Sequence, residues 1–157
     1  MEGRRRDGVV GVSDATHGMP PVLDGDARRP CTLHVCTSCR PPGTPREPER
    51  SRPGFIMYER LLNAIGDSPL RHVVDVRPTP CLSICPRPCG VALPLPGAWT
   101  YLFGDQNPGE TTRDIIACIE LYLDSPDGFM ERAKRPRSMR GSILGRVPPI
   151  QDGAQCT

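Results

Sequence analysis

Aromatic residues are scarce in this chain of 157 residues, which has one tryptophan, three tyrosines and three phenylalanines. The length allows one domain with a core of its own but not two ordinary domains with tails. Twenty prolines and sixteen glycines are many for a fully ordered chain, and they indicate loops or disorder over part of it. We therefore predict a single domain with a modest core.

The chain also lacks a strong charge imbalance and a long apolar run. Lys and Arg number twenty against eighteen Asp and Glu, and the formal net charge of +2 is too small to indicate nucleic-acid binding. No stretch is apolar enough to span a membrane. The arginine-rich residues 1–6 lack the apolar segment of a secretory signal. These absences predict a cytoplasmic protein that binds neither nucleic acid nor membrane.

Motifs of common enzyme classes are absent as well. No glycine-rich loop follows a strand and opens a helix, so nucleotide binding is not indicated. His34 and His72 fall in or beside expected strands, and His17 lies in a segment without apolar periodicity. No nucleophile and base are paired in the sequence, and a carrier or binding protein is therefore favoured over an enzyme.

Proline and charge patterns separate the structured part of the chain from the rest. Residues 1–29 show no sustained apolar period and are predicted to form a disordered leader. Residues 41–53 are rich in proline and are predicted to form a long loop that keeps Cys39 away from any helix. Residues 30–150 are predicted to be the domain, although few apolar anchors follow residue 127 and we expect loose docking there. Residues 151–157 are expected to be a flexible tail.

Hydrophobic periodicity predicts an α/β layer fold. The expected order is a strand at 32–35, a helix at 55–65, a strand at 72–76, a hairpin of 91–95 and 100–103, and a helix from 111 or 112 to about 125. Pro96 and Gly97 fit the centre of the hairpin turn, and Pro94 argues for an edge position. A strand, a helix and a second strand in this order form a parallel unit.

Eight cysteines in a chain without a secretory signal indicate metal ligation or redox chemistry rather than disulfides. Two pairs follow the two strands of the parallel unit: Cys36 and Cys39, then Cys81 and Cys85. Both pairs are therefore expected at the same carboxyl edge of the sheet. Four thiolates there would suit a 2Fe-2S cluster or a tetrahedral zinc ion. Arg40 and Arg87, beside these cysteines, would offset the excess negative charge.

The other cysteines have different expected roles. Cys89 lies close enough along the chain to replace one of the four ligands, and it stays open as an alternative. Cys31 begins the strand that Cys36 ends, so it lies roughly 16 Å away at about 3.3 Å per residue. Cys118 falls on the apolar face of a helix, where a free cysteine packs as a small hydrophobe. Cys156 is expected to be a tail thiol.

Three alternatives to an iron–sulfur site stay open. The same thiolates could bind zinc in a structural or metal-handling module, although a C-x-x-x-C pair flanked by proline is less typical of zinc. Cys36 and Cys39 could be the dithiol of a thiol-disulfide oxidoreductase, but the expected loop leaves no helix N-terminus to lower a thiol pKa. The cysteines could also be reduced structural thiols, which the paired spacing disfavours.

Several stretches together resemble a known family of predicted metal-binding proteins, number 1636 among the domains of unknown function. They are residues 35–40 (VCTSCR), 81–85 (CLSIC), 89–93 (CGVAL), 96–97 (PG), 99–101 (WTY), 103–105 (FGD), 125–128 (SPDG) and 146–149 (RVPP). The resemblance implies a thioredoxin-like, ferredoxin-like fold and a C-terminal segment that packs on the domain.

The second cysteine pair is also similar to that of thioredoxin-like 2Fe-2S ferredoxins, including the small subunit of respiratory NADH dehydrogenase. The first pair departs from them, since those ferredoxins place more residues between their first two cysteines. The expectation is an electron carrier in which Cys36, Cys39, Cys81 and Cys85 hold a 2Fe-2S cluster, with zinc as the alternative. Its partner would be an unidentified redox or metal-handling protein.

Overall fold

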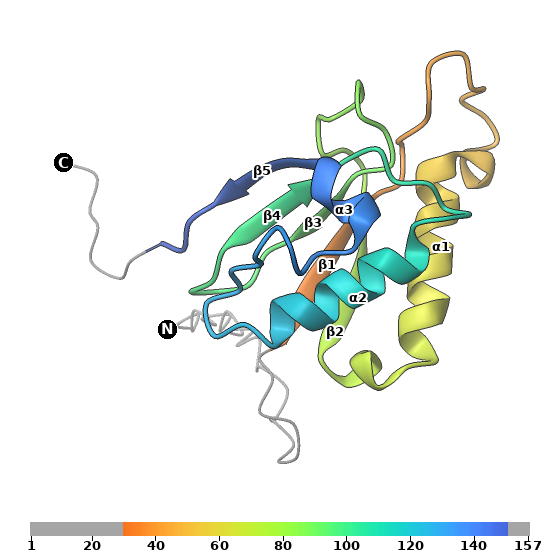
Figure 1. Ribbon diagram of the computed structural model, residues 1–157. Helices are drawn as coiled ribbons and strands as arrows, with labels where there is room; N and C mark the ends of the chain where they lie inside the picture. Colours follow the sequence, from red (N-terminus) through yellow and green to blue (C-terminus); the bar gives the residue numbers. More distant parts are fainter. Residues whose placement is uncertain (1–29, 151–157) are drawn as a thin grey trace, which may run out of the picture.

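The computed structural model describes residues 30–150 (Figure 1). The leader expected at 1–29, the tail expected at 151–157 and Cys156 lie outside the described residues. The main elements are β1 (Cys31–Cys36), α1 (Pro53–Gly66), β2 (Val74–Thr79), β3 (Val91–Leu93), β4 (Thr100–Phe103), α2 (Thr112–Leu123), α3 (Arg137–Gly141) and β5 (Ile143–Val147). The predicted α/β class is confirmed.

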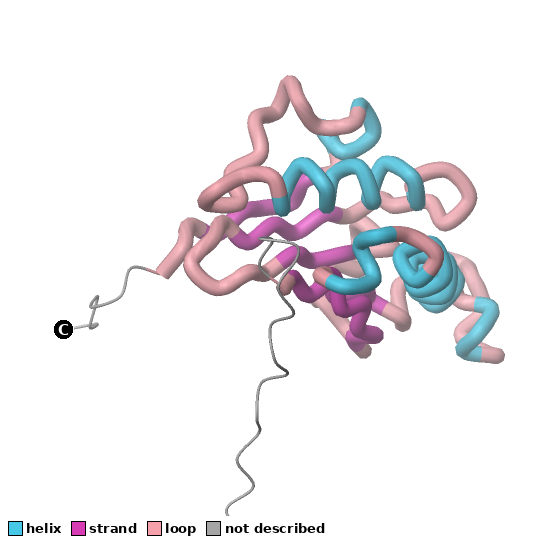
Figure 2. Tube along the Cα trace, turned by 90° about the horizontal axis from the view of Figure 1, so that it is seen from below, coloured by secondary structure: helices cyan, strands magenta, loops and turns pink. Residues whose placement is uncertain are grey.

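One five-stranded sheet, in the order β2-β1-β3-β4-β5, organises the described residues. β1 and β2 are parallel, as predicted, and every other neighbouring pair is antiparallel. Figures 1 and 2 show α2 lying over one face of the sheet, while α1 stands beside β1 and β2. Cys36 is the register partner of Thr79, so the two parallel strands end side by side.

The core lies between the sheet and these two helices. Met57, Leu61 and Ile65 repeat at helical spacing along α1 and are buried. Three of the seven aromatic residues, Tyr101, Phe103 and Tyr122, are fully buried here, and the Tyr101 ring stacks on Phe103 with 5.9 Å between ring centroids. Within residues 30–150 no helix combines the length and the apolar character needed to cross a membrane.

Proline positions explain two differences from the predicted strands. The second strand begins at Val74 rather than at 72, because residues 69–72 form a 3₁₀ turn, and it continues through Pro78 to Thr79. Proline is tolerated there because β2 is an edge strand and needs no second set of hydrogen bonds. The edge position predicted for the 91–95 strand is wrong, since β3 lies between β1 and β4 and ends one residue before Pro94.

The chain after residue 127 is packed, which corrects the expectation of loose docking and agrees with the family resemblance. β5 pairs with β4 and closes that side of the sheet. Met130 and Met139 are fully buried in the main core. The anchors were hard to recognise because they are isolated methionines between charged residues, without a period of their own.

Met139→Ala tests the contribution of this C-terminal segment to stability. Removing a fully buried methionine side chain should lower the free energy of unfolding by about 2–5 kcal/mol. The measurement is a urea titration followed by far-ultraviolet circular dichroism. Arg137→Ala, at an exposed position of the same helix, should change the free energy by less than about 0.5 kcal/mol. Equal values for the two variants would contradict the packing.

Candidate metal centre

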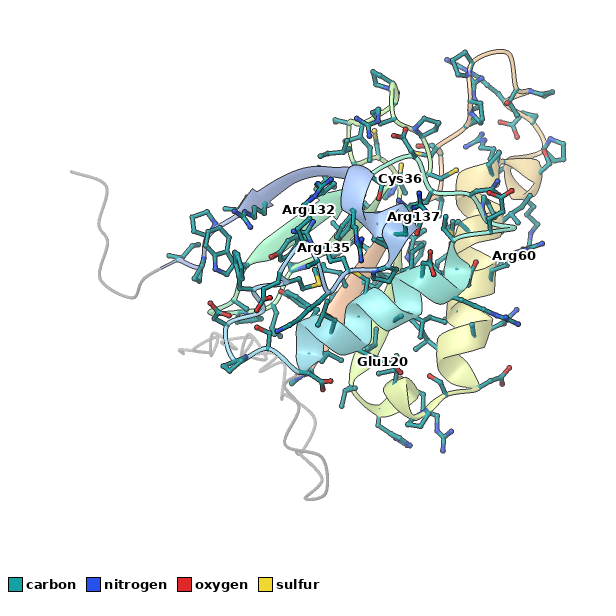
Figure 3. All side chains as sticks on the ribbon, in the orientation of Figure 1. Cys36, Arg60, Glu120, Arg132, Arg135 and Arg137 are labelled. Atoms are coloured by element: carbon teal, nitrogen blue, oxygen red, sulfur yellow. The ribbon has the colours of Figure 1, made fainter. Side chains whose placement is uncertain are left out.

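The loops that carry the two predicted cysteine pairs meet at the carboxyl edge of β1 and β2. The Thr37 N–H donates to the Thr79 carbonyl at 2.9 Å, and the Cys36 N–H donates to the Gly90 carbonyl at 3.0 Å. The first cysteine turn is thereby joined to both ends of the second loop. Figure 3 shows Cys36 at this end of the sheet. The predicted convergence of the two loops is present in the structure.

Three thiols form a small buried cluster, separate from the main core. Cys36, Cys39 and Cys89 are 2%, 3% and 3% exposed, and the partly buried side chain of Leu82 packs against them. Cys36 and Cys39 interact through their sulfur atoms. Cys89, expected only as an alternative ligand, therefore lies with the first pair.

The second pair is placed differently. Cys81 and Cys85 are exposed to solvent. The Ser83 N–H donates to the Cys81 sulfur at 3.2 Å, whereas Cys85 and Cys39 both line a hollow of about 440 Å³. Among residues 30–150 no three Cys, His, Asp or Glu side chains are grouped as a metal site. The fold thus brings the two pairs to one edge, and their side chains do not yet form a closed ligand set.

Backbone amides face the buried sulfurs. The amide N–H groups of Leu82 and Ser38 donate to Cys36, and those of Gly90 and Cys89 donate to Cys39. Amide hydrogen bonds of this kind stabilise thiolates and tune iron–sulfur potentials. Most of these amides belong to the second loop. The second loop therefore stabilises negative charge on the sulfurs of Cys36 and Cys39.

The thiol pKa values diverge within the cluster. The hydrogen bond from the Cys39 thiol is the main cause that lowers the pKa of Cys36 to about 5, against the opposing effect of burial. The same hydrogen bond, together with burial, raises the pKa of Cys39. Burial, with a smaller effect of the Cys36 charge, raises the pKa of Cys89 to about 11. The contact between Cys36 and Cys39 therefore favours the thiolate on one sulfur and the thiol on the other.

The N-terminus of α1 packs directly on the first cysteine turn. The Gly54 N–H donates to the Cys39 carbonyl at 2.8 Å. A Cβ atom at Gly54 would lie 2.2 Å from the Cys36 carbonyl oxygen, so only glycine fits. The prediction that the proline-rich loop separates Cys39 from any helix is wrong, because the loop folds back. No sequence signal beyond the Pro53-Gly54 pair indicated this contact.

Left-handed backbone shapes the second loop. Ser83 and Cys89 both have φ of 57°, a conformation that costs free energy for residues other than glycine. The turn at Ser83 directs its own N–H to Cys81, and the turn at Cys89 is followed by the Gly90 N–H that donates to Cys39. The strained positions therefore coincide with the sulfur contacts.

The two arginines predicted to offset negative charge have different surroundings. Arg87 forms an ion pair with Asp105 and donates to the Gly141 carbonyl at 3.3 Å, so its charge is already compensated. Arg40 lines the same hollow as Cys39 and Cys85. Arg40 is the one of the two that remains a candidate for charge compensation.

Two further cysteines lie away from this edge, as predicted. Cys31 is buried in the main core, with its thiol 3.9 Å from the Pro94 carbonyl oxygen. Cys118 is fully buried, and its sulfur lies 3.5 Å from that of Met130. Burial raises the pKa of each thiol to about 12. Both are packing residues.

This burial predicts the alkylation pattern of the metal-free full chain. At pH 8 iodoacetamide should modify the exposed Cys81 and Cys85 within minutes, while Cys31 and Cys118 stay unmodified because they are buried and protonated. The two buried thiols should react only after unfolding in guanidinium chloride. Peptide mass spectrometry measures each site. Modification of Cys118 at the rate of Cys81 would contradict its place in the core.

Gly54→Ala tests the contact between α1 and the first cysteine turn. The new methyl group must displace the Cys36 carbonyl, so we expect a loss of about 2 kcal/mol in the free energy of unfolding, measured by urea titration. Gly66→Ala is the matched control, because a Cβ at Gly66 in the same helix meets no atom within 4 Å. A Gly54→Ala variant as stable as the Gly66→Ala control would show that the contact is not needed.

No curated protein matches this chain. Among solved structures it is similar to a thioredoxin-like [2Fe-2S] ferredoxin from Aquifex aeolicus, with 19% identity and a TM-score of 0.49 over 77% of this chain and 96% of that one. It is also similar to the 1.5 Å crystal structure of the wild-type thioredoxin-like [2Fe-2S] ferredoxin from Aquifex aeolicus. The identity there is 19% and the TM-score 0.48, over 74% of this chain and 98% of that one. A family model matches residues 33–149, and the chain belongs to the family described as protein of unknown function (DUF1636).

Proposed function

We propose that this protein is a ferredoxin-like electron carrier that holds a 2Fe-2S cluster on cysteine thiolates. The proposed ligands are Cys36, Cys39, Cys81 and Cys85, with Cys89 as the alternative for one position in the second loop. The observation that carries the proposal is the meeting of two cysteine loops at one sheet edge, with backbone amides directed at the sulfurs.

The donor set fits such a cluster chemically. Every candidate ligand is a thiol, and three of the five, Cys36, Cys39 and Cys89, lie together in one buried cluster. Thiolates are the ligands of iron–sulfur clusters, and a bound 2Fe-2S cluster would supply one-electron redox chemistry at this edge. The chain's own part is to donate amide hydrogen bonds, to exclude water from Cys36 and Cys39, and to place Arg40 nearby.

The surroundings of the thiols suit an electron carrier better than a catalyst. The described lining of the hollow beside Cys39 and Cys85 contains no carboxylate and no histidine, and besides these two cysteines it consists of proline, serine and arginine residues. As part of the proposal we assign the protein to the cytoplasm, with a redox or metal-handling protein as its partner. Zinc bound by the same thiolates has no observation that favours it over iron.

A thiol-disulfide oxidoreductase is the second candidate, and one observation favours it. Cys36 and Cys39 interact through their sulfur atoms, and the pKa of Cys36 is lowered to about 5. A thiolate beside a second thiol is the arrangement used by C-x-x-C redox proteins. The N-terminus of α1 lies behind this turn, although its Gly54 N–H is bound to a carbonyl rather than to sulfur.

Cys81→Ser separates the two candidates. If the thiolates hold a cluster, protein purified without oxygen should be coloured, should contain iron and sulfide in equal amounts and should bleach with dithionite, and the variant should lose most of its iron. The measurements are a visible spectrum and iron, sulfide and zinc analysis. Cys118→Ala, which removes a core thiol outside the site, is the control and should retain the cluster.

The roles of Cys85 and Cys89 follow from the same assay. If Cys89 replaces a lost ligand, Cys85→Ser keeps part of the iron, and the Cys85→Ser/Cys89→Ser double variant loses it. A colourless wild-type protein with one zinc ion would replace the electron carrier by a zinc module. Metal-free protein that reduces a disulfide substrate, with the same rate after Cys81→Ser, would establish the oxidoreductase instead.

A further inference from the structure

A second hollow, of about 450 Å³, lies beside the edge strand β5 and contains no cysteine. Figure 3 labels two of its arginines on the segment before α3. Its lining combines guanidinium groups with apolar side chains and has no acidic residue: Phe129, Arg132, Arg135, Ile143, Leu144, Gly145 and Arg146. A concave surface with three arginines and an apolar floor has the composition of a ligand site.

Arg135 carries a buried positive charge in this hollow, and an anionic ligand would explain that charge. Its side chain is buried, with only 5% exposed, and its guanidinium lies over the Tyr101 ring at 5.9 Å. Nε and Nη2 both donate to the Met130 carbonyl, at 3.3 and 3.1 Å. No carboxylate among residues 30–150 forms an ion pair with it. A buried cation without a counter-charge is unfavourable.

The other two arginines add to this uncompensated charge. The guanidinium carbon of Arg146 lies 5.2 Å from the ring centroid of Trp99 and 4.9 Å from that of Phe129. Arg132 is exposed and donates Nη1 to the Arg140 carbonyl at 2.9 Å. Its sequence neighbour Glu131 is paired with Lys134 instead. Three cations thus face one hollow whose described lining includes no anion.

An acidic side chain on the adjoining turn, Asp127, is also engaged in hydrogen bonds. Asp127 accepts hydrogen bonds from the Phe129 N–H at 3.0 Å and the Ser125 hydroxyl at 3.1 Å. These bonds, the Phe129 one foremost, lower the pKa of Asp127. Asp127 therefore shapes the turn that carries Phe129 rather than compensating the arginines of the hollow.

The walls of the hollow are fixed by contacts between sequence stretches that lie outside the cysteine loops. The Trp99 N–H donates to the Asp127 carbonyl at 2.9 Å. Gly128 has φ of 71°, and a Cβ there would lie 2.6 Å from the Tyr122 ring, so the turn requires glycine. This turn sets Phe129 edge-on to Trp99 with 5.7 Å between centroids. Stretches 99–101, 125–128 and 146–149 thus converge on one place.

We propose that this hollow binds a small phosphate or carboxylate compound with an aromatic or aliphatic body. The guanidinium groups of Arg132, Arg135 and Arg146 would take the oxyanion, because their planar donor arrays match its oxygens. Phe129 and the aliphatic side chains of β5 would contact the body. The site is independent of the proposed cluster, since none of its residues belongs to the cysteine loops.

Trp99 makes the test direct, because it is the one tryptophan of the chain and its ring contacts Phe129 and Arg146. The full-length protein is titrated with inorganic phosphate and with phenyl phosphate, at constant ionic strength set by sodium chloride. We expect a saturable change in tryptophan emission, with phenyl phosphate binding more tightly than phosphate. The absence of any saturable change, checked by calorimetry, would overturn the proposal.

Variants assign the binding to the named residues. Arg132→Gln and Arg146→Gln should each weaken phenyl phosphate binding about tenfold or more by calorimetry, since each removes a charge-assisted hydrogen bond. Arg113→Gln, at an exposed position on α2, is the control and should leave affinity unchanged. If all three variants weakened phenyl phosphate binding equally, the binding would depend only on the net charge of the protein, and the proposed site would be wrong.

Two further titrations define the size of the ligand and the independence of the hollow from the cysteine loops. Hexaglutamate binding more tightly than phenyl phosphate would overturn a small-molecule site in favour of an acidic protein surface. Cys36→Ser, which affects only the cysteine site, should bind phenyl phosphate like the wild type. The two proposals can therefore fail separately. Phenyl phosphate binding does not depend on a cluster being present, and the iron content does not depend on phenyl phosphate binding.

Discussion

The parallel pairing of β1 with β2 is the constraint on which the candidate site depends. Cys36 and Thr79 are register partners at the ends of these strands, so two loops separated by more than forty residues of sequence leave the sheet together. Had the pair been antiparallel, the two loops would lie at opposite ends of the sheet. Every contact between the cysteine loops, including the amide hydrogen bonds to sulfur, follows from this register.

Close packing then fixes the first turn against α1 and the second loop. Gly54 leaves no room for a side chain beside the Cys36 carbonyl, and Cys89 accepts a left-handed backbone in the second loop. Among the proposed ligands, Cys36, Cys39 and the alternative Cys89 are buried, whereas Cys81 and Cys85 are exposed to solvent. Reorganisation on cluster binding would therefore fall mainly on the exposed loop.

The sequence was sufficient for features that depend on periodicity and chain order. The α/β class, the parallel unit and the meeting of the cysteine loops follow from alternating strands, the apolar face of α1, and prolines at strand ends. The contact of Gly54 with the first turn could not be predicted, because a proline-rich loop has no period from which its path can be derived. β5 was missed for a related reason, since its exposed positions Gly145 and Arg146 do not alternate with apolar ones.

Pro78 in β2 has a consequence for the behaviour of the protein at high concentration. β2 forms one edge of the sheet, and edge strands can recruit strands from other molecules. Proline has no N–H to offer, and Arg77 beside it carries a charge, so this edge is a poor template for such recruitment. At the opposite edge, Arg146 lies near the end of β5 and Pro148 and Pro149 follow the strand. Both edges of the sheet thus carry residues that disfavour the addition of a strand from another molecule.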